Sequence, residues 1–185
     1  MTTSGTPTAP AGEVPGAKKE IAVVETSMGT FEIELYPQDA PKTVENFVGL
    51  AGKKYFDGCR VHRVVPGFVI QMGDDKSKDT ALRAQWGTGG HSLWGKAFAD
   101  ELNPSTKSYQ EGYKKGVVAM ANAGPNTNTS QFFVCTANVG LPHSYTIFGK
   151  VVSGMDVIDK IGSVQRNHQD QPIVDVVVKK IHLKK

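Results

Sequence analysis

Two segments of the chain hold residue types that could bind and polarise a peptide. The first, residues 61–74, places Arg63 and Gln71 among valine, isoleucine and phenylalanine residues. An arginine is costly to bury among apolar residues unless it has a partner or faces a cleft. Its guanidinium stays charged at neutral pH and offers five N–H donors, so it can hydrogen-bond a carbonyl group. A surface arginine whose stem covers apolar surface is the alternative that the residue types leave open.

The second segment, residues 121–133, is a run of small and polar residues that ends in a pair of phenylalanines. Its glycine–proline step and its asparagines are typical of a loop, and the phenylalanine pair indicates entry into a strand. Such a loop exposes backbone N–H and C=O groups that a partner chain can use, and an aromatic residue at the strand start can floor a pocket. Turn-capping amides are the alternative, more so for Asn126 and Asn128 than for Asn122.

Together the two segments resemble the paired signatures of the cyclophilin family of peptidyl-prolyl isomerases, and the resemblance runs from about Ile21 to the C-terminus. It implies an enzyme that catalyses cis/trans rotation of X–Pro peptide bonds, assists protein folding, and uses no cofactor and no metal. The residues that match the family's catalytic positions are Arg63, Phe68, Gln71, Asn122 and Phe133. Those that match its substrate-binding positions are His62, Val69, Gly87, Ala121, Ala123, Thr127, Gln131, Leu141 and Tyr145.

The expected chemistry concerns amide resonance. Resonance gives the X–Pro bond a rotation barrier of about 18–20 kcal/mol, and rotation leaves a lone pair on the proline nitrogen. By the resemblance, Arg63 stabilises this twisted amide through hydrogen bonds that strengthen during rotation. The residues that match the family's proline pocket are Phe68, Val69, Phe133 and Leu141.

Three positions depart from the family's pattern. Val69 replaces the usual methionine, Tyr145 stands where histidine is common, and Gly140 stands where a tryptophan is often found. That tryptophan contributes to cyclosporin binding in the animal enzymes. We therefore expect the reaction to be kept and cyclosporin to bind weakly.

These residues need strands to position them. Strand-like patterns occur at residues 21–26, 30–35, 61–65, 68–72, 116–121, 131–135, 146–152 and 173–183. Apolar residues at helical spacing predict a helix from Asp39 to Gly52 and a second, short one after Gly154. Many strands, two helices and no repeated βαβ unit favour a mainly β fold: a closed antiparallel barrel of about eight strands, capped by two α-helices.

The same patterns predict where side chains point. Alternation within residues 61–65 places Val61, Arg63 and Val65 on one face. In the last strand the expected core residues are Val174, Val176, Val178 and Ile181. The long polar stretches 74–95 and 99–115 are expected to be loops, which tend to be functional or mobile at such lengths.

Length and composition predict one domain. The chain has 185 residues and a net charge of +3, and its tail at residues 1–19 is rich in Thr, Pro, Gly and Ala. We expect this tail to be disordered and residues 20–185 to form the isomerase domain. No apolar run approaches the roughly 20 residues that a membrane span needs. The N-terminus resembles no secretory signal, so the expected compartment is the cytoplasm.

The cysteines and charges limit the expected partners. Cys59 and Cys135 form no zinc-binding pattern with the scattered histidines; a disulfide between them stays open, although two thiols fit a reducing compartment better. The scattered positive charge argues against nucleic acid. We expect a monomer that acts on proline-containing peptides and on unfolded or flexible protein segments.

Two other classes of protein remain as alternatives. A proline-segment binding module needs the apolar pocket more than it needs the cation of Arg63. A lipocalin-type barrel that binds small molecules predicts neither the Arg63 motif nor the Asn122 motif.

Overall fold

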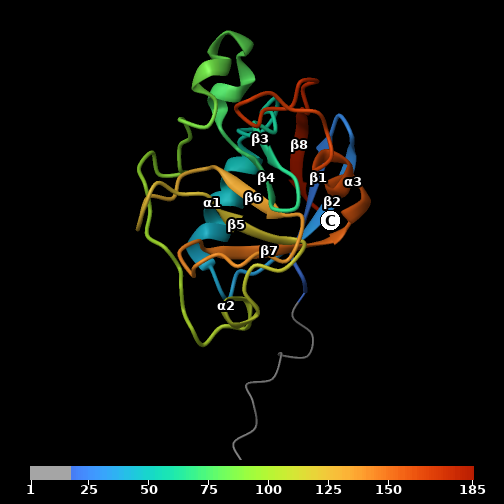
Figure 1. Cartoon of the computed structure of the whole chain (residues 1–185). Coiled ribbons are helices and arrows are strands. Elements are labelled where there is room, and N and C mark those ends of the chain that lie inside the picture. Colours follow the sequence, from blue (N-terminus) through green and yellow to red (C-terminus); the bar gives the residue numbers. More distant parts are fainter. Residues whose placement is uncertain (1–17) are drawn as a thin grey trace, which may run out of the picture.

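The computed structural model describes residues 18–185, so the prediction of a disordered tail lies almost wholly outside the described residues. Eight strands form one antiparallel sheet in the order β3-β4-β6-β5-β7-β2-β1-β8, which is curled into a barrel (Figure 1). The strands are β1 (Ile21–Thr26), β2 (Gly29–Leu35), β3 (Arg63–Val65), β4 (Val69–Met72), β5 (Val117–Met120), β6 (Phe132–Cys135), β7 (Ile147–Ser153) and β8 (Val178–Leu183). The predicted eight-stranded antiparallel fold is confirmed.

The two edge strands, β3 and β8, are joined by the segments that precede them. Gly58 N–H donates to the Val178 carbonyl at 2.8 Å, and Val61 N–H donates to the Val176 carbonyl at 2.9 Å. An isolated antiparallel bridge between Arg60 and Val177 completes this pairing. The backbone groups of residues 58–61 and 176–178 are therefore hydrogen-bonded to each other, although both segments lie at the edges of the sheet.

Alternation along the strands separates two apolar faces. On β2 the side chains of Phe31, Ile33 and Leu35 are buried inside the curl, as their period-two pattern predicts. The inner core also contains Ile70 and Met72 of β4. The intervening residues of β4, β5, β6 and β7 point to the outer face, where a second buried cluster forms. This outer face therefore has apolar packing of its own, which is unusual for a sheet side turned to solvent.

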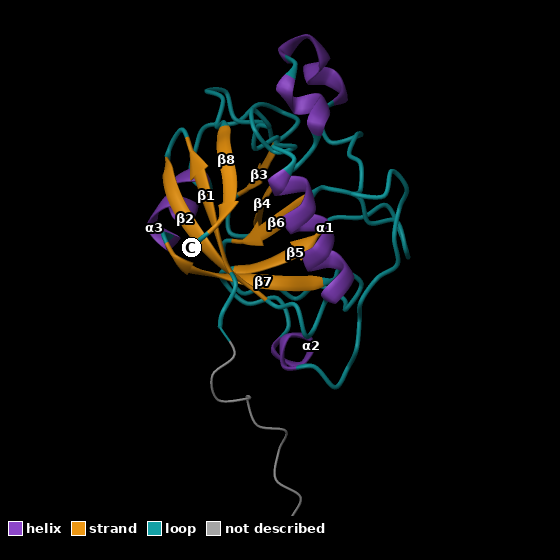
Figure 2. Ribbon diagram, turned by 180° about the vertical axis from the view of Figure 1, so that it is seen from behind, coloured by secondary structure: helices purple, strands orange, loops and turns teal. Residues whose placement is uncertain are grey.

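Helix α1 (Pro41–Gly52) covers the inner core, and Figure 2 shows it lying over strands β5, β6 and β7. Its Phe47 ring packs against Phe56, Phe132 and Phe148, with ring centroids 5.3–5.4 Å apart. The short helix α3 (Met155–Ile161) buries Ile158 and Ile161. Both helices follow the apolar spacing that predicted them.

Two long stretches predicted as loops contain helical turns. Residues Asp75–Lys78 and Thr80–Gln85 form 3₁₀ turns, η1 and η2, which Figure 1 draws as the green coil above the sheet. Helix α2 (Lys107–Glu111) lies in the other stretch, capped by the Thr106 hydroxyl, which accepts from Tyr109 N–H at 3.4 Å. Such short turns bury little and therefore leave no apolar period in the sequence.

Two predictions of side-chain direction were wrong. Val61 is buried in the inner core and not on the face of Arg63, because the chain before Arg63 pairs with residues 176–178 instead of continuing the β3 ladder. The last strand begins at Val178, and Val174 is 80% exposed in the preceding loop. Val176, Val178 and Ile181 are buried as expected.

Both cysteines are buried and free. Burial raises the pKa of the Cys59 and Cys135 thiols to about 12, so neither is a thiolate at neutral pH. Within residues 18–185 no helix is both long enough and apolar enough to cross a membrane.

Candidate active site

A row of paired residues crosses four strands on the outer face of the sheet. Arg63 on β3 is paired with Gln71 on β4, Gln71 with Phe133 on β6, and Phe133 with Ala119 on β5. Directly paired residues point to the same side of an antiparallel sheet. The strand pairing therefore places a cation, an amide and an aromatic ring side by side.

The row is supported by a chain of hydrogen bonds between amides. Arg63 Nη1 donates to Gln71 Oε1 at 3.5 Å, and Gln71 Nε2 donates to Gln131 Oε1 at 2.9 Å. Gln131 Nε2 in turn donates to the carbonyls of Gly87 at 3.0 Å and Gly89 at 2.8 Å. The bond to Arg63 is the longest of the chain, so the guanidinium retains donors for another acceptor.

A buried carboxylate anchors the far end of this chain. Asp74 is fully buried, and its Oδ2 accepts from the backbone N–H groups of Gly87 at 2.6 Å and Gly89 at 3.1 Å. A Cβ on residue 89 would clash with the Asp74 carboxylate, so only glycine fits at this position. The Gly87–Gly90 loop is thus bound from below by Asp74 and from the side by Gln131.

His62 lies behind this loop. Its side chain is 4% exposed, and a Cβ on Gly87 would stand 3.3 Å from its Cδ2. Neither ring nitrogen has a hydrogen-bond partner among residues 18–185. Burial lowers the pKa of His62 to about 4, with the charge of Arg63 adding to the effect and Asp74 opposing it. His62 is therefore neutral at physiological pH.

The outer apolar cluster lies beside Arg63 and Gln71. Its buried members are Val69, Tyr113, Val117, Ala119, Phe133, Cys135 and Ile147, with Phe68, Ala121, Val139, Leu141 and Tyr145 packed at its edge. All four residues matched to the proline pocket, Phe68, Val69, Phe133 and Leu141, belong to this cluster. Phe133 and Tyr145 make an edge-to-face contact with ring centroids 5.6 Å apart.

The loop at residues 121–127 borders the cluster and is tightly bonded. Asn122 Nδ2 donates to the Ser144 carbonyl at 2.9 Å, and its Oδ1 accepts from Gly124 N–H at 3.2 Å. The Thr127 hydroxyl accepts from Ala123 N–H at 2.8 Å. No hydrogen bond within residues 18–185 uses the main-chain N–H or C=O of Asn122. This pair of groups is open to an extended peptide.

Sequence reasoning missed Tyr113. Its hydroxyl donates to the Tyr145 carbonyl at 2.7 Å and accepts from Tyr145 N–H at 3.1 Å, so it fixes the backbone of the residue that packs on Phe133. Tyr113 also lines a hollow of about 410 Å³ beside Gly140 and Leu141. Its only sequence signal is an aromatic residue within the polar stretch 99–115, which the sequence predicts to be a loop.

No group of three or more His, Cys, Asp or Glu side chains within residues 18–185 is arranged to hold a metal ion. The arrangement on the outer face is instead a fixed cation next to an apolar cluster and an open backbone edge. This geometry suits a reaction in which the enzyme hydrogen-bonds a peptide substrate and does not attack it with a nucleophile.

Comparison with known proteins identifies the family. The family model described as cyclophilin type peptidyl-prolyl cis-trans isomerase/CLD matches residues 21–183. The chain belongs to the cyclophilin family. It is a cyclophilin-type peptidyl-prolyl cis-trans isomerase, as the resemblance of its two segments implied.

Relatives from several organisms cover most of the chain. The human protein named peptidyl-prolyl cis-trans isomerase-like 1 is 43% identical over 160 residues, which cover 86% of this chain and 89% of that protein. The protein of the same name from Aspergillus fumigatus is 43% identical over 157 residues, covering 84% of this chain and 90% of that protein.

Solved structures show the same fold. A cyclophilin type peptidyl-prolyl cis-trans isomerase from Cryptosporidium parvum matches with a TM-score of 0.81 at 29% identity, covering 91% of this chain and 99% of that chain. A structure of that protein in the presence of the dipeptide Ala-Pro matches with a TM-score of 0.79 at 30% identity, covering 89% and 99%.

Proposed function

We propose that Arg63 is the catalytic cation of this isomerase and that Phe68, Val69, Phe133 and Leu141 hold the substrate proline. The observation that carries the proposal is the row that pairs Arg63 with Gln71 and Gln71 with Phe133, at the edge of the outer apolar cluster. The pyrrolidine ring packs on Phe133, and the guanidinium lies two strands away on the same face. A peptide proline in the cluster is therefore within reach of the arginine side chain.

The physical role of Arg63 follows from amide resonance. Rotation localises a lone pair on the proline nitrogen, which the planar amide ground state does not present. A guanidinium N–H that donates to this nitrogen binds the twisted amide more strongly than the planar one, and this difference lowers the barrier. The hydrogen-bond chain from Gln71 to Asp74 keeps the arginine in place before the substrate arrives.

The rest of the site suits an extended chain. The free N–H and C=O of Asn122 can pair with the substrate backbone, and Gln131 is buried between Gln71 and the glycine loop. We propose unfolded or flexible proline-containing segments as the substrates, with the isomerase acting as a monomer that assists folding. The Ala-Pro dipeptide in the presence of which the Cryptosporidium parvum relative was crystallised is of this chemical class. A protease-coupled assay on proline peptides, run with site variants, tests the assignment.

We expect kcat/KM for a proline peptide to vary little between about pH 6 and about pH 8. Arg63 keeps its charge throughout this range, and the pKa of about 4 keeps His62 neutral. Exchange NMR on a proline peptide measures the rate without a coupled protease. A steep step in the rate near pH 6.5, the ordinary pKa of histidine, would contradict the assignment of Arg63 as the only cation needed.

We expect cyclosporin to inhibit the enzyme only weakly, and Gly140→Trp to tighten inhibition by about thirtyfold. A Cβ on Gly140 would meet nothing within 4 Å, so the position is open to a side chain, and a tryptophan there adds an apolar face and an indole donor. Inhibition constants and kcat/KM of the variant and the parent are compared in one assay. The kcat/KM should change much less than the inhibition constant.

Val139→Trp tests the neighbouring position, and Gly52→Trp is the matched control. Val139 packs on the outer cluster and its N–H donates to the Tyr113 carbonyl at 2.9 Å, so a larger side chain there should disturb the site. Gly52 is exposed at the end of α1, where a Cβ would meet nothing within 4 Å, and its variant should change neither constant. Nanomolar inhibition of the unmodified protein would refute the role given to Gly140.

A further inference from the structure

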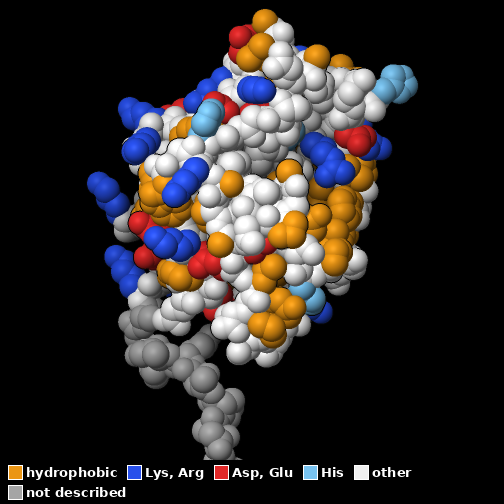
Figure 3. Space-filling model, turned by 90° about the vertical axis from the view of Figure 1, so that its left-hand side faces the viewer, with side chains coloured by type: hydrophobic (Ala, Val, Ile, Leu, Met, Phe, Trp, Pro, Cys, Tyr) orange, Lys and Arg blue, Asp and Glu red, His pale blue; other side chains and the backbone are white. Residues whose placement is uncertain are grey.

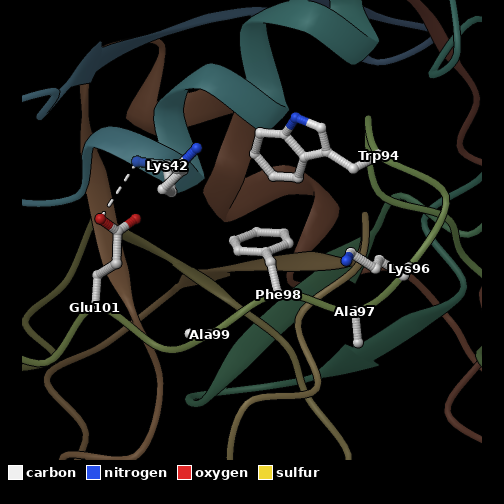
Figure 4. Close-up of a pocket in the computed structure, with 7 residues that line it drawn as sticks. All are labelled: Lys42, Trp94, Lys96, Ala97, Phe98, Ala99 and Glu101. Atoms are coloured by element: carbon white, nitrogen blue, oxygen red, sulfur yellow. Dashed lines mark hydrogen bonds between the residues drawn. The ribbon is translucent and has the colours of Figure 1, made fainter.

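A surface hollow that the isomerase mechanism does not use lies at the start of helix α1. It has a volume of about 330 Å³ and is lined by Trp94, Phe98, Lys42, Lys96, Glu101 and two alanines. Figure 4 shows the ring of Trp94 next to that of Phe98, with Lys42 and Glu101 on one side and Lys96 on the other. We call it the Trp94 hollow.

Its walls are apolar and held by backbone bonds. The Trp94 side chain is 38% exposed, which is high for a tryptophan, and its ring meets Phe98 edge-on at 5.4 Å. Phe98 N–H donates to the Asn128 carbonyl at 3.0 Å, and Asn128 N–H donates back at 3.3 Å. The hollow is therefore formed before any ligand binds, and it can accept a bulky apolar side chain. The same pairing joins it to the loop that contains Asn122.

The rim of the hollow is positively charged. Lys42 Nζ lies 5.1 Å from the centre of the Trp94 ring, and Lys96 makes no ion pair with any residue from 18 to 185. The Glu101 carboxylate is used internally, because it accepts from Thr43 N–H at 2.7 Å, the Thr43 hydroxyl at 2.8 Å and Lys42 N–H at 3.3 Å. It caps the first turn of α1 and leaves little negative charge for a ligand.

The other carboxylates nearby do not neutralise the rim. Glu45 lies 3.7 Å from Lys42 Nζ, but both side chains are more than half exposed, and such pairs are weak. Asp100 accepts from Asn126 N–H and from Asn128 Nδ2, so it serves the neighbouring loop. Figure 3 shows one face of the molecule, on which hydrophobic patches have Lys and Arg side chains beside them.

We propose that the Trp94 hollow is a second binding site, which takes an acidic peptide segment with one bulky apolar side chain. The apolar side chain enters the hollow and packs against the exposed surfaces of Trp94 and Phe98, and carboxylates on its flanks pair with Lys42 and Lys96. The apolar walls supply affinity, and the two cations select acidic segments over basic ones. The site contains none of the residues assigned to isomerisation, so it binds peptides without proline.

NMR titration with a proline-free peptide, one leucine flanked by glutamates, tests the proposal. The chain has two tryptophans, and the other, Trp86, is buried with its indole N–H donated to the Asp79 carbonyl at 3.0 Å. The Trp94 indole signal should therefore shift saturably while that of Trp86 stays in place. Replacing the glutamates by glutamines should weaken binding by about threefold or more. Replacing the leucine by serine should weaken it by about tenfold or more.

Variants separate this site from general charge effects. Lys96→Glu should weaken binding of the acidic peptide by roughly fivefold or more, and Trp94→Ala by about tenfold or more. Lys179→Glu, an exposed lysine on β8 outside the hollow, is the matched control and should leave binding unchanged. Lys96→Glu should leave turnover of a short proline peptide unchanged.

Three results would overturn the proposal. The Trp94 indole could stay in place at saturating peptide, or the glutamine peptide could bind as tightly as the glutamate peptide. The Trp94 signal could also depend on protein concentration without peptide, which would make a second copy of the chain the occupant.

Discussion

The Arg63→Ala variant is expected to lower kcat/KM for a proline peptide by at least about tenfold, or roughly 1.4 kcal/mol of transition-state stabilisation. Within residues 18–185 the Arg63 side chain makes one long hydrogen bond, at 3.5 Å to Gln71, so its removal costs the fold little. The loss should therefore appear in the rate and not in the melting temperature. The protease-coupled assay and thermal unfolding, run on the same preparations, separate the two effects.

Two further variants define what Arg63 supplies. Arg63→Lys should recover only a small part of the rate, because an ammonium group replaces the planar fork of donors. Arg83→Ala is the matched control: this arginine pairs with Asp175 at 2.6 Å and belongs to the η2 turn, outside the row. An alanine variant at position 63 with full activity would remove Arg63 from the mechanism.

The sequence could predict which residues meet at the site but not how they are held. Arg63 and Gln71 lie in one short motif, so the strand pattern of that motif is enough to place them on adjacent strands. The bond from Gln71 to Gln131 joins residues 60 apart, and it depends on the β4–β6 register. Register is set by how the whole sheet packs, which a single sequence does not show. The bonds by which Asp74 holds the Gly87–Gly90 loop cannot be predicted from the sequence for the same reason.

The fold was predictable where an element has one face exposed to solvent and the other buried. Phe31, Ile33 and Leu35 alternate with glutamates, and the strand lies where this pattern placed it. Prediction failed where backbone pairing or a polar bond decided the structure, as at Val61 and at Tyr113. Val174 looks like a core residue by type, yet it precedes the strand and faces solvent. Apolar character predicts burial only after the element's ends are known.

Acid should destabilise the enzyme through His62. Its pKa is about 4 in the folded protein against an ordinary value of 6.5, so the unfolded chain binds the proton more tightly. The unfolded state is then favoured as the pH falls through 6.5 toward 4, and the full difference corresponds to roughly 3 kcal/mol. Stability from this residue is thus present above about pH 6.5 and lost below it. Urea unfolding at several pH values measures the change.

The contribution of His62 is isolated by comparison with His62→Leu. Leucine has no proton to bind, so the free energy of unfolding of the parent should fall relative to that of the variant by roughly 3 kcal/mol between about pH 7 and about pH 4. Near neutral pH the variant should be about as stable as the parent, because neither ring nitrogen of His62 has a hydrogen-bond partner within residues 18–185 to lose. His168→Gln changes an exposed histidine and is expected to keep the pH dependence of the parent. If parent and His62→Leu lose stability in parallel on acidification, His62 is not the buried neutral base described here, and another group must account for acid unfolding.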